Sequence, residues 1–147
     1  MILVDANVLL YAVNEDAEHH LESREWLDDA LHGSRTVLLP WASLVAFIRI
    51  ATHPRIFEAP LSVAAALENV SEWLSRPASA VPGGGSELLP ALTSFLQDTG
   101  TGGNLTNDAH LASIALTQQA TVATFDSDFG RFRSVRWARP RDLMTRS

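Results

Sequence analysis

The chain has 147 residues, of which 46% are hydrophobic, and it carries a formal net charge of −6 and no cysteine. This length and composition indicate one folded domain with a substantial core, and they exclude a disordered chain. No apolar stretch reaches the roughly 18 to 20 residues of a membrane span, and the apolar start lacks the basic leader of a signal peptide. We expect a single domain over residues 1–143 with a tail at 144–147. Because a chain without cysteine needs no disulfide bonds, its composition is compatible with the reducing cytoplasm, where we expect the protein to be located.

The positive charges are distributed unevenly. All 11 are arginine, and six of them lie in the last 17 residues, where Asp142 is the only acid. The overall negative charge argues against a protein that coats nucleic acid through general electrostatics. The arginine-rich end fits either a solvated tail or bidentate contacts to phosphate, for which arginine is suited.

Predicted strands and helices alternate along the chain. Short runs of aliphatic and β-branched residues predict strands at residues 2–4, 36–39, 78–81 and 120–125, with an edge strand at 134–137. Apolar residues at three- and four-residue steps predict helices over residues 7–13, 17–31, 41–52, 63–74, 86–97 and 107–118. Ser62, Ser86 and either Thr106 or Asn107 are the expected N-caps. This alternation predicts a parallel sheet with helices on both faces, in which ligands bind beyond the carboxyl ends of the strands.

Several acidic residues are predicted to meet at that edge. Asp5 and Asp126 each stand where an aliphatic strand ends, and parallel strands would deliver both carboxylates to the same side of the sheet. A polar side chain follows each of them two residues later, Asn7 in one case and Asp128 in the other. Asp108 falls in the first turn of its helix, on the apolar face that should pack on the sheet.

Each aspartate taken alone also fits a structural role. Asp5 and Asp126 could be helix caps or turn formers, and Asp108 could favour the positive end of its helix. Three carboxylates at one edge, however, raise one another's pKa unless a cation lies between them. Oxygen ligands of this kind suit a hard divalent cation, so the sequence predicts a Mg²⁺ site, with Mn²⁺ as the alternative ion.

Three stretches carry a family resemblance: ILVDANVLLYAVN at the start, LTNDAHLASIAL in the second half and VATFDSDFGRF near the end. They resemble the most recognisable segments of PIN-domain ribonucleases, and among these the VapC toxins of type II (VapBC) toxin–antitoxin systems, in the same order and spacing from residue 1 to about 143. The resemblance implies a PIN-like three-layer α/β/α sandwich whose acidic cluster holds Mg²⁺ or Mn²⁺ to hydrolyse RNA phosphodiester bonds. It also implies an endoribonuclease toxin that forms a homodimer and is inhibited by a cognate VapB-like antitoxin.

The family's site residues can be carried over by position. The resemblance implies that Asp5, Asp108 and Asp126 bind the metal, and that Asp128 is an additional catalytic acid. It also implies that Asn7 and Thr124 are supporting polar groups.

The chain departs from the family pattern on the helix after the second strand. Many PIN nucleases carry a glutamate there, whereas this chain has Ala46 and no acid between residues 36 and 57. Asp128 or Glu22 could supply the missing carboxylate, and the number of metal ions, one or two, stays open. Arg49 on the same helix could contact RNA phosphate or pair with an acid of the cluster, and Arg131 is a second candidate for an RNA contact.

Two other functions are alternatives to the nuclease activity. The first is a PIN-like interaction module with weak or no catalysis, which Ala46 favours. The second is phosphotransfer at Asp5, as in haloacid-dehalogenase phosphatases, which would need an acid where this chain has Asn7.

Histidine and tryptophan side chains are expected to lie outside the site. His110 is two residues after Asp108, which predicts that it points away from the cluster. His19 and His20 lack the partner spacing of a zinc site. The tryptophans are expected in the core or in an interface, and not as platforms for RNA bases: Trp26, Trp41, Trp73 and Trp137.

Overall fold

The computed structural model describes residues 1–100 and 102–144, so residues 145–147 of the expected tail lie outside it. The strands are β1 (Ile2–Val4), β2 (Val37–Leu38), β3 (Ser79–Ala80), β4 (Thr121–Ala123) and β5 (Trp137–Ala138). The helices are α1 (Ala6–Val13), α2 (His20–Leu31), α3 (Trp41–Ala51), α4 (Val63–Ser75), α5 (Leu89–Thr99), α6 (Leu105–Gln118) and α7 (Pro140–Met144). Two 3₁₀ helices, η1 (Ser86–Leu88) and η2 (Ser127–Arg131), complete the chain. In the described part, no helix is both long enough and apolar enough to cross a membrane.

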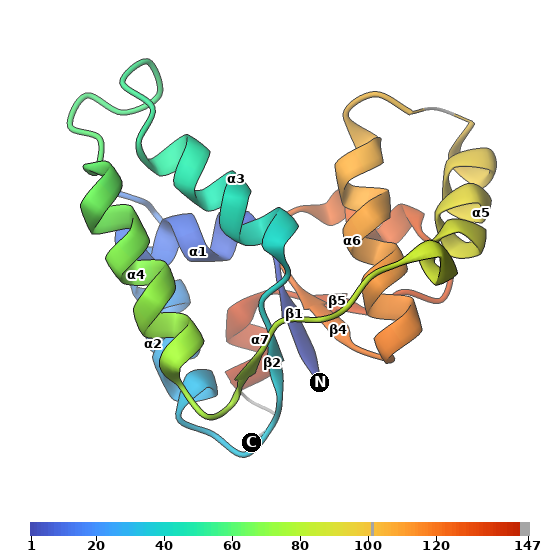
Figure 1. Cartoon of the computed structure of the whole chain (residues 1–147), viewed down its shortest axis with the longest axis horizontal. Helices are drawn as coiled ribbons and strands as arrows, with labels where there is room; N and C mark the ends of the chain where they lie inside the picture. Colours follow the sequence, from blue (N-terminus) through green and yellow to red (C-terminus); the bar gives the residue numbers. More distant parts are fainter. Residues whose placement is uncertain (101, 145–147) are drawn as a thin grey trace.

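The five strands form one parallel sheet in the order β3–β2–β1–β4–β5. The chain moves outward from β1 through β2 to β3, and then returns to the other side of β1 at β4. In such sheets the ligand crevice lies beyond the carboxyl ends of the strands where this reversal occurs, which here are β1 and β4. Helices cover both faces of the sheet (Figure 1), which confirms the predicted α/β/α sandwich.

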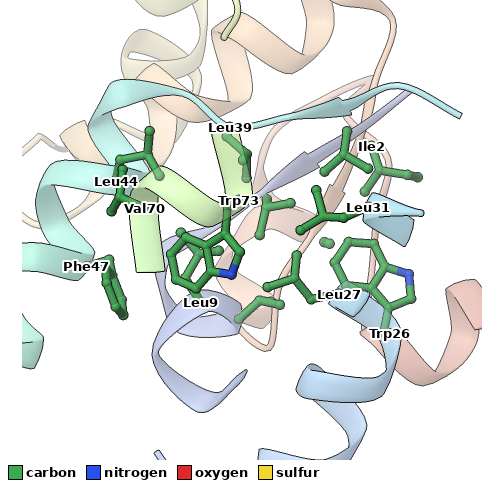
Figure 2. Packing of buried hydrophobic residues seen from close by; sticks show 14 of the residues in the cluster. Ile2, Leu9, Trp26, Leu27, Leu31, Leu39, Leu44, Phe47, Val70 and Trp73 are labelled. Carbon is green, nitrogen blue, oxygen red and sulfur yellow. The ribbon is translucent and has the colours of Figure 1, made fainter. Parts of the chain in front are cut away.

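Each face of the sheet has its own hydrophobic core. Ile2 and Val4 of β1 face the core formed with α1, α2, α3, α4 and α7, whereas Leu3 faces the core formed with α5 and α6. Figure 2 shows side chains of α1 to α4 converging in the first core, where the rings of Phe47 and Trp73 meet edge-on with centroids 4.9 Å apart. Burial on both faces explains why the central strand is purely aliphatic.

Alanine residues bring α6 close to the sheet. Ala109, Ala112 and Ala115 are each 0% exposed, and Leu111 beside them is buried as well. The face of α6 that was expected to pack on the sheet is therefore confirmed. Because α6 leads directly into the parallel strand β4, its N-terminus lies at the edge where β1 and β4 end.

Several predicted boundaries were wrong. The helix expected from residue 17 begins at His20. The preceding residues form a loop instead, in which Asn14 Oδ1 accepts a hydrogen bond from the Asp16 amide and His20 Nδ1 lies 2.8 Å from the Tyr11 carbonyl oxygen. Ser86 begins η1 and makes no side-chain cap, and α6 begins at Leu105, also without a side-chain cap.

Other expectations at the helix and strand ends were closer. Ser62 caps α4 as predicted, accepting a bond of 3.1 Å from the Ala65 amide. The strand expected over 120–125 ends at Ala123: the Thr124 amide still donates to the Ala138 carbonyl at 3.0 Å, but the Phe125 amide donates at 3.3 Å to the side chain of Asn7 in α1. The expected edge strand is present as β5, shifted toward the C-terminus.

Candidate metal-binding active site

Asp5 links the end of β1 to the start of α1. Its amide donates to the Ala123 carbonyl at 3.1 Å, which continues the ladder to β4. Its Oδ1 accepts a 2.7 Å bond from the Ala6 amide and caps α1, and its Oδ2 accepts a 2.8 Å bond from Thr124 Oγ1. Burial raises the pKa of Asp5, the bonds from Thr124 and Ala6 oppose this effect, and the charge of Asp126 adds to it. The cap role and the position at the sheet edge therefore coexist in one residue.

Asn7 and Thr124 join the ends of the two central strands. Asn7 Nδ2 lies 3.2 Å from both Asp5 Oδ2 and Thr124 Oγ1, and Asn7 Oδ1 accepts a 3.3 Å bond from the Phe125 amide. Thr124 Oγ1, fully buried, also accepts a 3.0 Å bond from the Asp126 amide. These two side chains hold Asp5 and the segment from Thr124 to Asp126 in a fixed relation.

Three carboxylates crowd together beside this network. Oxygen atoms of Asp108, Asp126 and Asp128 all lie within 4.8 Å of one another. Asp126 Oδ1 accepts a 2.9 Å bond from the Asp128 amide and so caps η2, while Asp108 projects from the first turn of α6. Asp5 is not a member of this close trio, although its charge acts on Asp108.

The crowding changes the acidity of Asp108 strongly. Burial, the charges of Asp5, Asp126 and Asp128, and a side-chain hydrogen bond with Asp126 together raise the pKa of this carboxyl from 3.8 to about 7, and burial is the largest of these causes. A divalent cation would relieve this repulsion, and carboxylate oxygens are the ligands that Mg²⁺ and Mn²⁺ prefer. The donor set therefore fits such an ion.

A cavity of about 550 Å³ lies between α3 and α6 and includes Asp5 and Asp108 in its lining. Ser43 Oγ donates a 2.7 Å bond to the Val4 carbonyl, which holds the first turn of α3 at the end of β1. Ala46 lines this cavity, so the position where many PIN nucleases carry a glutamate does face the site.

Two residues that were expected outside the site also line this cavity. His110 does so because the lining face of α6 is centred on Asn107 and Leu111, with Asp108 at one margin and His110 at the other. Trp41 at the start of α3 is 54% exposed, whereas Trp26 and Trp73 are buried as predicted. The residue spacing on each helix was visible in the sequence, but the opposition of α3 and α6 was not.

The remaining predicted site residues have different surroundings. Arg49 lines the cavity, and within residues 1–100 and 102–144 it forms no ion pair, so of its two alternative roles the pairing with an acid of the cluster is not formed. Arg131 is exposed at the end of η2. Glu22 was wrong as a replacement ligand, because its Oε1 pairs with Arg139 at 3.2 Å and with Arg141 at 3.4 Å, which attaches α7 to α2.

Comparison with known proteins places the chain in a family. The PIN domain model matches residues 2–135. Ribonuclease VapC37 of Mycobacterium tuberculosis is 46% identical over 144 residues, covering 98% of this chain and all of the relative. Ribonuclease VapC33 of the same species is 36% identical over 95% of this chain and 98% of the relative.

Solved structures share the fold at low sequence identity. VapC20 of Mycobacterium tuberculosis, described as a toxin that cleaves the sarcin-ricin loop, superposes with a TM-score of 0.68 at 17% identity, covering 92% of this chain and 99% of the other. The VapBC2 complex of Rickettsia felis, bound to a DNA fragment from its promoter, has a TM-score of 0.66 at 19% identity, covering 95% and 98%. The chain therefore belongs to the PIN-domain family, among its VapC proteins.

Proposed function

We propose that this protein is a metal-dependent endoribonuclease, the toxin of a VapBC pair, which acts in the cytoplasm. The observation that carries this proposal is the trio of Asp108, Asp126 and Asp128 within 4.8 Å, beside the buried Asp5, at the edge where β1 and β4 end. The names of the relatives, which are ribonucleases, support the same activity.

From the resemblance to PIN nucleases we assign the metal to Asp5, Asp108 and Asp126; Asp128, which completes the close trio with Asp108 and Asp126, is the additional acid. When bound, Mg²⁺ or Mn²⁺ would supply a Lewis acid that activates water and stabilises the charge of a phosphodiester transition state. Thr124 fixes the orientation of the Asp5 carboxylate through its 2.8 Å bond. Asp108 must lose its proton to act as a ligand, so the proton and the metal compete at this carboxyl.

Cations at the rim of the site would hold the substrate. Arg49 lines the cavity without an ion pair in the described part of the chain, and Arg131 is exposed three residues after Asp128. Guanidinium groups make bidentate contacts with phosphate. We assign both arginines to contacts with the RNA backbone.

A VapB-like antitoxin is the proposed inhibitor, and a homodimer is the proposed assembly. Structures with the same fold include VapBC complexes, which supports a partner of this kind. An arginine of the partner that reached the crowded carboxylates would pair with Asp5 or its neighbours and would exclude the metal.

The decisive experiment is an RNA cleavage assay with purified protein. Total RNA is incubated with Mg²⁺ or Mn²⁺, and the ends produced are sequenced. Wild-type protein should cleave, Asp108→Asn should lose activity by more than a hundredfold, and Asp98→Asn, an exposed acid on α5, should keep it. Cleavage that survives in EDTA would contradict the metal assignment.

The second candidate is an interaction module without catalysis, and Ala46 in the cavity wall is the observation in its favour. Induction in cells separates the two functions. A nuclease toxin predicts growth arrest that Asp5→Asn abolishes. Arrest that persists in this variant, together with no cleavage by the purified protein, would establish the interaction module instead.

A further inference from the structure

The α3 wall of the cavity differs in chemistry from the rest of the site. Trp41, Val45 and Arg49 follow one another at four-residue spacing and therefore form a row along one side of α3. Trp41 and Val45 are 54% and 55% exposed, so they present adjoining apolar surfaces to the cavity. Neither side chain is among the proposed metal ligands.

The charges on this wall complement an anion. Arg49 is the one charged residue of α3, and the helix has no acid. A glutamate in place of Ala46 would neutralise Arg49 and would repel an anionic ligand, and alanine avoids both effects. The carboxylates in the cavity lining come from the end of β1 and from α6. An anionic group bound against α3 would therefore contact Arg49 and not a carboxylate.

Shape also favours a flat, bulky ligand. Ala42 and Ala46 form a second row next to Trp41 and leave the cavity open along α3. Its volume of about 550 Å³ lies within the roughly 300 to 1,000 Å³ of sites that enclose small organic ligands. On the α6 side, His110 offers a ring nitrogen as a hydrogen-bond donor.

We infer that Trp41, Arg49 and His110 form a nucleotide subsite next to the metal-binding carboxylates. An RNA base stacks on the exposed face of the Trp41 indole, Arg49 binds the adjoining phosphate, and His110 donates a hydrogen bond from the α6 side. This inference rests on the proposed function, because it treats RNA as the ligand of the site. Stacking on an aromatic side chain is the general way in which proteins hold single-stranded bases.

Binding measured without metal tests the subsite separately from cleavage. Fluorescein-labelled RNA hexamers of random sequence are titrated with protein in EDTA and followed by anisotropy. Trp41→Ala should raise the Kd about five- to hundredfold, the usual loss for one stacked base, and Trp41→Phe should restore most of the affinity. Arg49→Gln should weaken binding and reduce its dependence on salt concentration.

Matched controls lie outside the cavity. Leu21→Ala removes an exposed apolar side chain from α2, and Arg55→Gln removes an exposed arginine from the loop after α3. Both should leave the Kd for the hexamers within about twofold of wild type, which is the range of surface substitutions.

Three results would overturn the inference. They are an unchanged Kd in Trp41→Ala, an equal loss in Trp41→Ala and Trp41→Phe, and no hexamer binding by wild-type protein. If Trp41→Ala changes the molecular mass in solution but not the Kd, Trp41 contacts a second copy of the chain instead. Wild-type protein that binds hexamers in EDTA but never cleaves with metal contradicts the proposed nuclease and leaves the subsite standing.

Discussion

Replacing Asp108 by asparagine should stabilise the metal-free protein at pH 8. The folded protein holds a proton on Asp108 up to a pKa of about 7, whereas the ordinary value for the unfolded chain is 3.8. The folded state therefore binds more protons between pH of about 4 and 7, and stability falls as the pH rises through that interval. Asparagine has the same shape and never acquires the charge.

The magnitude follows from the difference in pKa. At about 1.4 kcal/mol for each tenfold change in proton affinity, the rise to about 7 corresponds to a ceiling of about 4 kcal/mol. Asp108 is only half-buried, so solvent screening reduces the expected gain to about 2 kcal/mol. For a chain of this length, this free energy corresponds to a Tm about 4 to 8 °C higher.

Thermal unfolding followed by circular dichroism measures the effect, in EDTA at pH 5 and at pH 8. The gain of Asp108→Asn over wild type at pH 5 should be only about a third of the gain at pH 8, and the Asp98→Asn control should show no such difference. Saturating Mn²⁺ should reverse the order, because the wild type gains binding energy that the variant lacks. An Asp108→Asn variant no more stable than wild type at pH 8 in EDTA would refute the reasoning.

Three further substitutions test the surroundings of the cluster. Thr124→Val removes a buried hydroxyl that bridges Asp5 and the Asp126 amide, so urea unfolding should show a loss of about 1 to 3 kcal/mol, which Thr124→Ser should largely restore. Glu22→Ala should release α7 and cost about 1 kcal/mol in the same assay, without altering Mn²⁺ affinity; a weaker Mn²⁺ site would make Glu22 a ligand after all. Ala46→Glu should raise the number of Mn²⁺ ions bound, counted by electron paramagnetic resonance, from one to two, and two ions in wild-type protein would contradict this expectation.

The bond between Thr124 and Asp5 shows why the site depends on the sheet. These residues are 119 positions apart in the chain, and they meet because β1 and β4 are parallel neighbours in register. Any change that shifts this register by one residue would turn Thr124 away from Asp5. The pairing of β1 with β4 therefore stabilises the sheet and also positions the carboxylates of the site.

Local patterns in the sequence determined much of the fold and the location of the site. Aliphatic runs that end at Asp5 and before Asp126 predicted two buried strands, because period and polarity are local properties. The helical spacing around Asp108 predicted the face of α6 that packs on the sheet, and the structure confirms it. Thr124 and Asn7 were expected to support the site, and their bonds to Asp5 are consistent with that role.

Only the tertiary structure decided how the walls of the site are built. His110 and Trp41 enter the cavity because α3 and α6 face each other across the end of β1, and no local spacing specifies that opposition. Glu22 is removed from the candidate ligands by Arg139 and by Arg141 of α7, which lie more than 100 residues away in the sequence. Sequence by itself determined which elements carry the carboxylates, since that depends on local periodicity. The partners of each side chain depend on contacts between distant segments, which form only when the layers pack.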